Sequence, residues 1–170
     1  MIPRAALAVL VALLPASALA AGASDALSVL CPRQQAVAGA VDAASVLSGI
    51  ASLVLAAQFR AETSCDPWAV NRKTGARGPM QILPGRSADP DHLESAELDD
   101  PGVNFRLGAL HLRKMIRLCG TLGGALSLYH GNGGAYHGRR RCDVDDWARK
   151  VLDLVSWARR KVARLREARS

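Results

Sequence analysis

One uncharged stretch constrains the fold of this chain more than any other feature. No charged residue occurs between Asp42 and Arg60. Apolar residues recur there at steps of three and four: Val46, Ile50, Val54, Ala57 and Ala61. This spacing predicts one helix with a buried face, which we place from Val37 to Glu62. Because alanine, serine and glycine dominate the stretch, a core helix is favoured over a membrane span.

The composition changes after this predicted helix. Proline and glycine are frequent between residues 63 and 85, which indicates a long connection made of turns. Further helices are predicted at about 101–118, 122–129 and 143–167, and Asp143 is the expected N-cap of the last one. No segment alternates apolar and polar residues as a strand would. The sequence therefore predicts a mainly α single domain with a long loop and at most a minor β element.

Residues 1–20 are typical of a secretory signal peptide. Arg4 precedes an apolar run at 5–14, and Ala18-Leu19-Ala20 has the small residues of a cleavage site. An apolar run of about ten residues is half as long as a membrane span, so an anchor is disfavoured. We expect an exported protein, periplasmic or secreted, whose domain spans 21–170.

The net charge of +7 is concentrated at one end of the chain. Residues 21–138 hold ten basic and ten acidic residues, whereas residues 139–170 hold eleven basic and five acidic ones. Nucleic-acid binding is disfavoured, because the basic residues are not spread around aromatic ones on a recognition surface. The basic face of the last helix is a candidate for contact with an anionic wall or membrane surface. The alternative is a face that is merely solvated.

Glu62 is a candidate catalytic acid by position alone. In a helix it shares a face with Leu55 and Phe59, and a polar loop follows it. A carboxyl group at such an apolar boundary resists ionisation, as a general acid working near neutral pH must. The alternative is an exposed, inert glutamate at a fraying helix end.

Four sequence blocks, in the same order, resemble the soluble lytic transglycosylase (SLT) domain family, which is goose-type-lysozyme-like. The blocks are ETSCDPWAVN at 62–71, GARGPMQILP at 75–84, Asp100-Pro101 with Asn104, Gly108 and Leu112, and LYHG at 128–131; Trp147 and Val151 fit the family's closing helix. The resemblance covers about residues 50–154. It implies a lysozyme-like fold and cleavage of the glycan strands of bacterial peptidoglycan.

The resemblance also implies roles for individual residues. Glu62 falls on the catalytic acid, and the implied substrate-binding residues are Thr63, Gly78, Met80, Gln81, Tyr129 and His130. The carboxyl group of Glu62 would first protonate the oxygen that links N-acetylmuramic acid (MurNAc) to N-acetylglucosamine (GlcNAc). It would then take the proton of the MurNAc C6 hydroxyl, which leaves a 1,6-anhydro end. Peptidoglycan is the implied partner, no cofactor or metal is implied, and we expect a monomer.

Two alternatives remain open at this stage. A lysozyme-like hydrolase needs a second carboxylate, for which Asp66, Asp99 and Asp100 are candidates. A non-catalytic wall-binding protein could keep the same fold. His130, which replaces an asparagine of the family, adds a group that titrates near neutral pH.

Four cysteines in an exported chain indicate two disulfides. Our hypothesis is that Cys31 pairs with Cys65 and Cys119 with Cys142, because each bridge would then clamp one side of the cleft that the resemblance implies. The alternative is a metal site, which would use Cys119, Cys142 and the two histidines between them, His130 and His137. This alternative is disfavoured.

Overall fold

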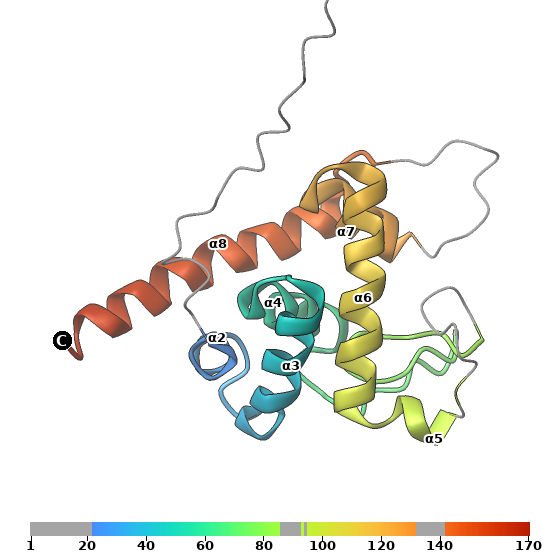
Figure 1. Ribbon diagram of the computed structural model, residues 1–170, viewed down its shortest axis with the longest axis horizontal. Coiled ribbons are helices and arrows are strands. Elements are labelled where there is room, and N and C mark those ends of the chain that lie inside the picture. The colour runs from blue at the N-terminus through green and yellow to red at the C-terminus, as the bar shows by residue number, and fades with distance from the viewer. Residues whose placement is uncertain (1–21, 86–92, 94, 132–141) are drawn as a thin grey trace, which may run out of the picture.

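The computed structural model is mainly helical and describes residues 22–85, 93, 95–131 and 142–170 (Figure 1). Its helices are α2 (Ala23–Leu30), the 3₁₀ helix η1 (Gln35–Val37), α3 (Ala38–Ser48), α4 (Ser52–Thr63), α5 (Ser95–Leu98), α6 (Pro101–Cys119), α7 (Leu122–His130) and α8 (Asp146–Glu167). In the described ranges, β pairing is limited to isolated bridges of Arg77 with Val70 and with Ile82. The predicted fold class is therefore confirmed. The predicted signal peptide at 1–20 lies outside the described residues.

The prediction of one helix from Val37 to Glu62 is wrong, because the chain breaks at Gly49. Gly49 adopts a left-handed conformation (φ 70°) that ends α3, and α4 begins three residues later. The Ser48 hydroxyl accepts a hydrogen bond from the Ile50 backbone N–H, and Arg113 of α6 donates one to the Ser48 carbonyl oxygen. These contacts satisfy groups that a continuous helix would have paired internally. Val46, predicted on the buried face, is 86% exposed as a result.

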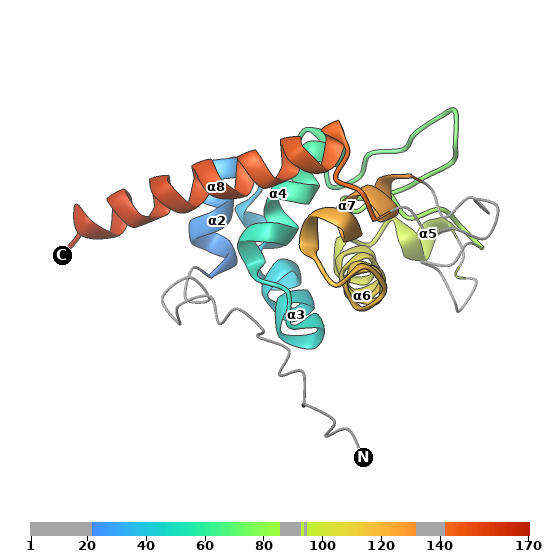
Figure 2. The same cartoon turned by 90° about the horizontal axis from the view of Figure 1, so that it is seen from above.

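Helix α4 forms the centre of the molecule. It packs against α2, α3 and α8, and each residue from Ser52 to Phe59 is buried. Figures 1 and 2 show the other helices arranged around it, with α8 lying across one side and α6 on another. The Phe59 ring meets Phe105 of α6 edge-on, with centroids 5.5 Å apart. Because residues 52–59 are buried, the last turn of α4 extends from a helix that the core holds in place.

Helices α6, α7 and α8 begin at side-chain caps. Asp100 accepts a hydrogen bond from Val103 N–H at the start of α6, and Thr121 accepts one from Gly124 N–H at the start of α7. The last helix starts at Asp146 with Asp145 as its N-cap, so the predicted cap Asp143 is wrong. Helices α2 and α5 were not predicted. None of the described helices combines the length and apolar character that crossing a membrane requires.

Candidate active site

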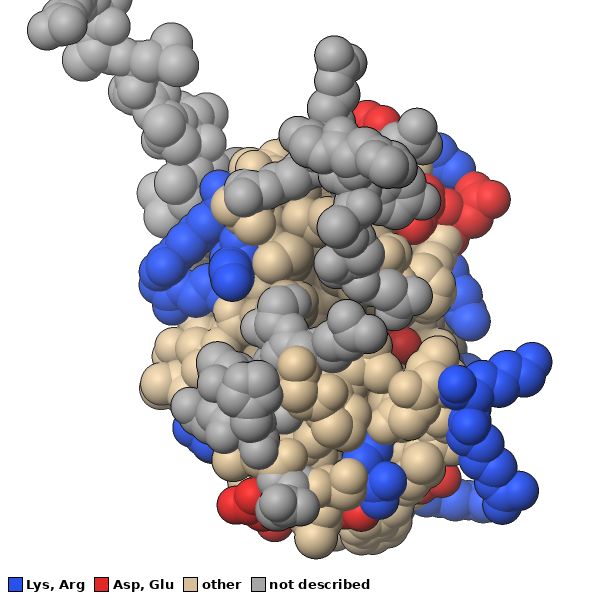
Figure 3. All heavy atoms as spheres, turned by 90° about the vertical axis from the view of Figure 1, so that its right-hand side faces the viewer, with Lys and Arg blue, Asp and Glu red and all other residues tan. Residues whose placement is uncertain are grey.

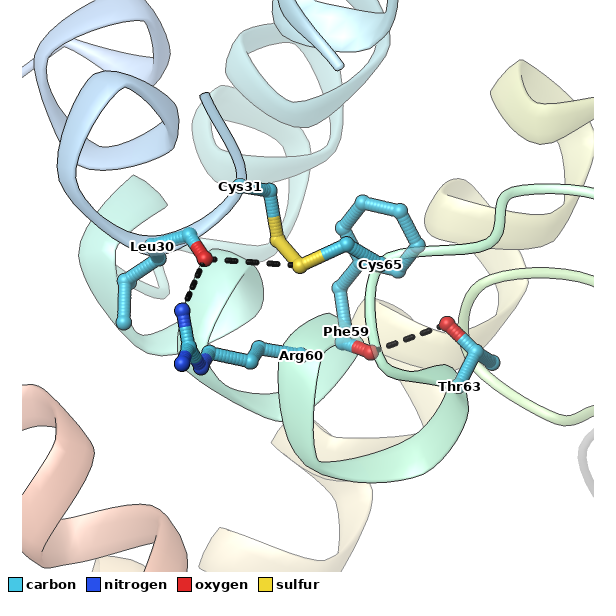
Figure 4. Close-up of a disulfide and its surroundings, with 6 residues drawn as sticks. All are labelled: Leu30, Cys31, Phe59, Arg60, Thr63 and Cys65. Atoms are coloured by element: carbon cyan, nitrogen blue, oxygen red, sulfur yellow. Dashed lines mark hydrogen bonds between the residues drawn. A yellow bond between two sulfur atoms is a disulfide. The ribbon is translucent and has the colours of Figure 1, made fainter. Parts of the chain in front are cut away.

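Glu62 lies in the last turn of α4, where the buried helix meets the loop. The helix ends at Ser64, and both Ser64 and Cys65 adopt positive φ angles, 55° and 71°. Non-glycine residues rarely adopt this conformation, so outside contacts must hold it. The Cys31–Cys65 disulfide is one such contact, and Arg60 adds another by donating to the Leu30 carbonyl oxygen at 2.5 Å (Figure 4). The turn after Glu62 is thus tied to the end of α2.

Burial changes the chemistry of the Glu62 carboxyl group. It raises the pKa of Glu62 from its ordinary value of 4.5 to about 7, although the Gln58 amide and the charge of Lys150 oppose the shift. Both protonation states of Glu62 are then accessible near neutral pH. Such a carboxyl group can both donate and accept a proton without a large free-energy cost.

The loop segment around Met80 is held by one side chain of α6. Asn104 is fully buried; its Oδ1 accepts from Met80 N–H at 2.8 Å, and its Nδ2 donates to the carbonyl oxygens of Arg77 and Leu98 at 2.9 Å. Gly78 has φ 70°, and a Cβ there would lie 2.3 Å from Asn104 Nδ2. Only glycine therefore allows the loop to approach Asn104 this closely.

Tyr129 of α7 is bonded to this loop and lies near enough to Glu62 for the charge of that carboxyl group to act on it. Its hydroxyl donates to the Met80 carbonyl oxygen at 2.8 Å. Burial and, to a smaller extent, the negative charge of Glu62 raise the pKa of Tyr129 well above its ordinary value. The phenol therefore stays protonated, and its single proton is donated to the Met80 carbonyl oxygen. His111 of α6 packs edge-on against its ring, with centroids 5.3 Å apart.

The other predicted site residues lie around this centre with different roles. Gln81 braces the loop, because its Nε2 donates to the carbonyl oxygens of Gly78 at 3.0 Å and Ala69 at 3.3 Å. The Thr63 hydroxyl donates back to the Phe59 carbonyl oxygen at 3.0 Å, so it is engaged within α4 (Figure 4).

His130 is exposed, yet its ring stacks on Trp147 of α8, with centroids 4.4 Å apart and planes 7° from parallel. Its pKa is lowered mainly by partial burial, which the charge of Asp145 opposes. The imidazole is therefore neutral at pH 7, when it is an acceptor as well as a donor.

Sequence reasoning gave no individual role to three residues that shape this site: Gln58, Asn104 and Lys150. Lys150 lies on the exposed side of α8, but its charge acts on both Glu62 and His130. Gln58 precedes Glu62 by one helical turn and is fully buried. Among the described residues, neither of its amide atoms has a hydrogen-bond partner of ordinary geometry. A buried amide in this state costs about 1–3 kcal/mol of stability.

The second disulfide joins Cys119, at the end of α6, to Cys142, just before α8. Both cysteine pairs therefore match our hypothesis, and thiols joined in this way cannot bind a metal as thiolates. The backbone of Cys142 lies against α7, since a Cβ on Gly124 would be 2.4 Å from its carbonyl oxygen. The bridge thus holds the entry to α8 close to the helix that carries Tyr129.

Comparison with known families agrees with this geometry. The family model described as the transglycosylase SLT domain matches residues 40–149, well over half of the chain. The chain belongs to the SLT domain family. The match contains α4, the loop around Met80, α6 and α7, whereas α2 and most of α8 lie outside it. Searches of curated proteins and of solved structures found no match.

Membership of the SLT family places the chain among lytic transglycosylases, whose substrate is peptidoglycan. The helical architecture around α4 is the one expected for this lysozyme-like family. Figure 3 shows one face of the SLT domain: where its atoms are described, mainly uncharged side chains occupy the middle, and Lys and Arg side chains project at both edges.

Proposed function

We propose that the protein is an exported lytic transglycosylase that cleaves the β-1,4 bond between MurNAc and GlcNAc, with Glu62 as its only catalytic carboxyl group. The observation that carries this proposal is the state of Glu62, whose pKa is raised to about 7 by burial at the end of α4. A surface glutamate at a fraying helix end would have no such shift.

The mechanism uses the two protonation states of Glu62 in turn. The protonated carboxyl group gives its proton to the bridging oxygen as the bond from that oxygen to MurNAc C1 breaks. The resulting carboxylate takes the proton of the MurNAc C6 hydroxyl, whose oxygen forms a new bond to C1. Glu62 ends the cycle protonated, and the product carries a 1,6-anhydro ring without consuming water. The Tyr129 hydroxyl donates its proton to Met80, so its oxygen is suited to accept a hydrogen bond from the protonated carboxyl group or from a sugar hydroxyl.

The three candidates for a second catalytic carboxylate have structural partners. Asp66 accepts from Trp68 N–H at 3.0 Å, Asp99 accepts two hydrogen bonds from the Arg77 guanidinium, and Asp100 caps α6. A lysozyme-like hydrolase needs a carboxylate that is free to act as nucleophile or base. Because these three carboxylates already accept structural hydrogen bonds, the route that uses Glu62 alone is favoured.

The test is digestion of purified peptidoglycan by wild type, Glu62→Gln and Glu167→Gln. Glutamine keeps the shape of Glu62 but has no proton to give, so we expect turbidity clearing to be lost while the protein still sediments with the wall. Glu167→Gln makes the same chemical change at an exposed residue at the end of α8 and should clear like wild type. Mass spectrometry should find anhydro ends, which are one water lighter than reducing ends.

Each alternative function predicts a different result in the same experiment. Reducing ends in place of anhydro ends would mean hydrolysis. Sedimentation with the wall but no clearing by wild type would mean a non-catalytic binding protein. Clearing by Glu62→Gln at the wild-type rate would show that Glu62 is not the catalytic acid.

The basic half of α8 is proposed as a secondary contact with the anionic wall. Arg159, Arg160, Lys161 and Arg164 are exposed there, whereas Arg166 in the last turn is ion-paired with Asp25 of α2. Such attraction is screened by salt. Sedimentation with the wall should therefore weaken between low and high ionic strength; unchanged sedimentation would exclude this contact.

A further inference from the structure

Gln58 is a buried polar side chain in the middle of an otherwise enclosed helix. Its residue is 0% exposed, and its neighbours Ala56, Ala57 and Phe59 are equally buried. In the described part of the chain, neither amide atom has a hydrogen-bond partner of ordinary geometry. Native proteins rarely leave a buried amide unpaired without a functional reason.

The position of Gln58 in α4 supplies such a reason. Residues four apart in a helix lie one above the other on the same face, so Gln58 and Glu62 share one side of α4. The Gln58 amide is close enough to act on the Glu62 carboxyl group, where it favours the ionised form. Hydrogen bonds between catalytic groups are often long or poorly aligned without substrate and shorten when substrate binds.

We propose that Gln58 is the positioning residue of Glu62 and that its amide hydrogen-bonds the carboxyl group in both steps of the reaction. An amide has a donor and an acceptor. Its Nε2 can donate to the carboxylate, and its Oε1 can accept from the protonated carboxyl group. A group that alternates between acid and base therefore keeps a partner throughout the cycle. This inference rests on the proposed role of Glu62.

The charged and titratable groups near Glu62 come from α6, α7 and α8, and each is less suited than Gln58 to bond both protonation states of the carboxyl group. Lys150 of α8 favours only the carboxylate, and Tyr129 of α7 already donates its proton to the Met80 carbonyl oxygen. His111 of α6 packs against the ring of Tyr129. Unlike these groups, the Gln58 amide can bond both protonation states of the Glu62 carboxyl group.

The experiment replaces Gln58 with methionine, which has nearly the same volume but no amide. We expect kcat for anhydro-product formation to fall at least tenfold, since the carboxyl group loses its orientation. We also expect the alkaline limb of the kcat/KM profile to move to higher pH, because an interaction that lowers the Glu62 pKa is gone. The urea midpoint of unfolding should be no lower than that of wild type, because methionine fills the same space and leaves no buried amide in the core.

Leu55→Met is the matched control, since it changes another fully buried residue of α4 without altering any polar group. It should keep the wild-type pH profile and a similar kcat. A Gln58→Met enzyme with the wild-type kcat, or with a lower kcat and an unmoved alkaline limb, would overturn the proposal. An active Glu62→Gln enzyme would instead overturn the proposed function, so the two failures are distinguishable.

Discussion

Replacing Gly108 with alanine tests how tightly α6 holds the loop that carries Met80. A Cβ on Gly108 would lie 2.4 Å from Met80 Cβ and 2.7 Å from Met80 Cγ. Carbon atoms in contact are normally about 3.5–4.0 Å apart, so the loop or the helix must shift by about 1 Å. Met80 cannot shift freely, because its N–H is bound to Asn104 and its carbonyl oxygen to Tyr129.

The size of the effect follows from two opposing contributions. Overpacking a core costs about 1–3 kcal/mol, and the upper end applies here because the clash involves a Cβ attached to a held backbone. Alanine is a better helix former than glycine by about 1 kcal/mol. We therefore expect Gly108→Ala to lose about 2 kcal/mol in free energy of unfolding. Its glycan-cleaving activity should also fall, since Met80 orients Tyr129.

Urea unfolding of wild type, Gly108→Ala and Gly39→Ala measures this difference. Gly39 lies in α3, and a Cβ there meets nothing within 4 Å. The control receives the gain in helix propensity without the clash, so it should be stabilised by up to about 1 kcal/mol. If Gly108→Ala proved as stable as Gly39→Ala, the Met80 loop would not be packed against α6 in the way described.

Three further predictions concern the same core. Asn104→Ala removes hydrogen bonds to Met80, Arg77 and Leu98 and should cost about 3 kcal/mol in urea unfolding; an unchanged midpoint would contradict it. Replacing Cys119 and Cys142 by alanine opens a loop with a sequence separation of 23, and the loss of chain constraint should lower the free energy of unfolding by about 3 kcal/mol. Glu62 has its folded-state pKa raised to about 7 from 4.5, so the native state binds more protons than the unfolded chain between these values. Wild type should therefore lose stability relative to Glu62→Gln as pH rises from 5 to 8, and a difference that did not vary with pH would refute the buried-acid assignment.

The helical fold was predictable from the sequence because apolar periodicity and capping residues are local signals. Pro101 after Asp100 marked the start of α6 correctly. The break at Gly49 was missed, since an isolated glycine within a periodic apolar run is compatible with a continuous helix. One contact that supports the break, from Arg113 to the Ser48 carbonyl oxygen, joins residues 65 apart in the sequence.

The candidate site was predictable only where a residue carries its own chemistry or matches a family motif. Glu62 and Tyr129 were identified in this way. The sequence did not indicate a role for Gln58, because a polar residue in an apolar run is normally expected at the surface. In the structure Gln58 is fully buried. The role of Asn104 depends on three backbone groups, of Arg77, Met80 and Leu98, that lie outside α6. A local sequence pattern does not predict such contacts.

The attachment of the Met80 loop to α6 has a consequence for its dynamics. Loops normally open to solvent independently of the helices that they connect. Here the Met80 amide is bonded to a buried side chain in the first turns of α6, and its carbonyl oxygen is bonded to α7. Opening this loop therefore requires α6 and α7 to loosen as well. In hydrogen exchange, the Met80 amide should belong with the slow protons of the helices, although it lies outside regular secondary structure.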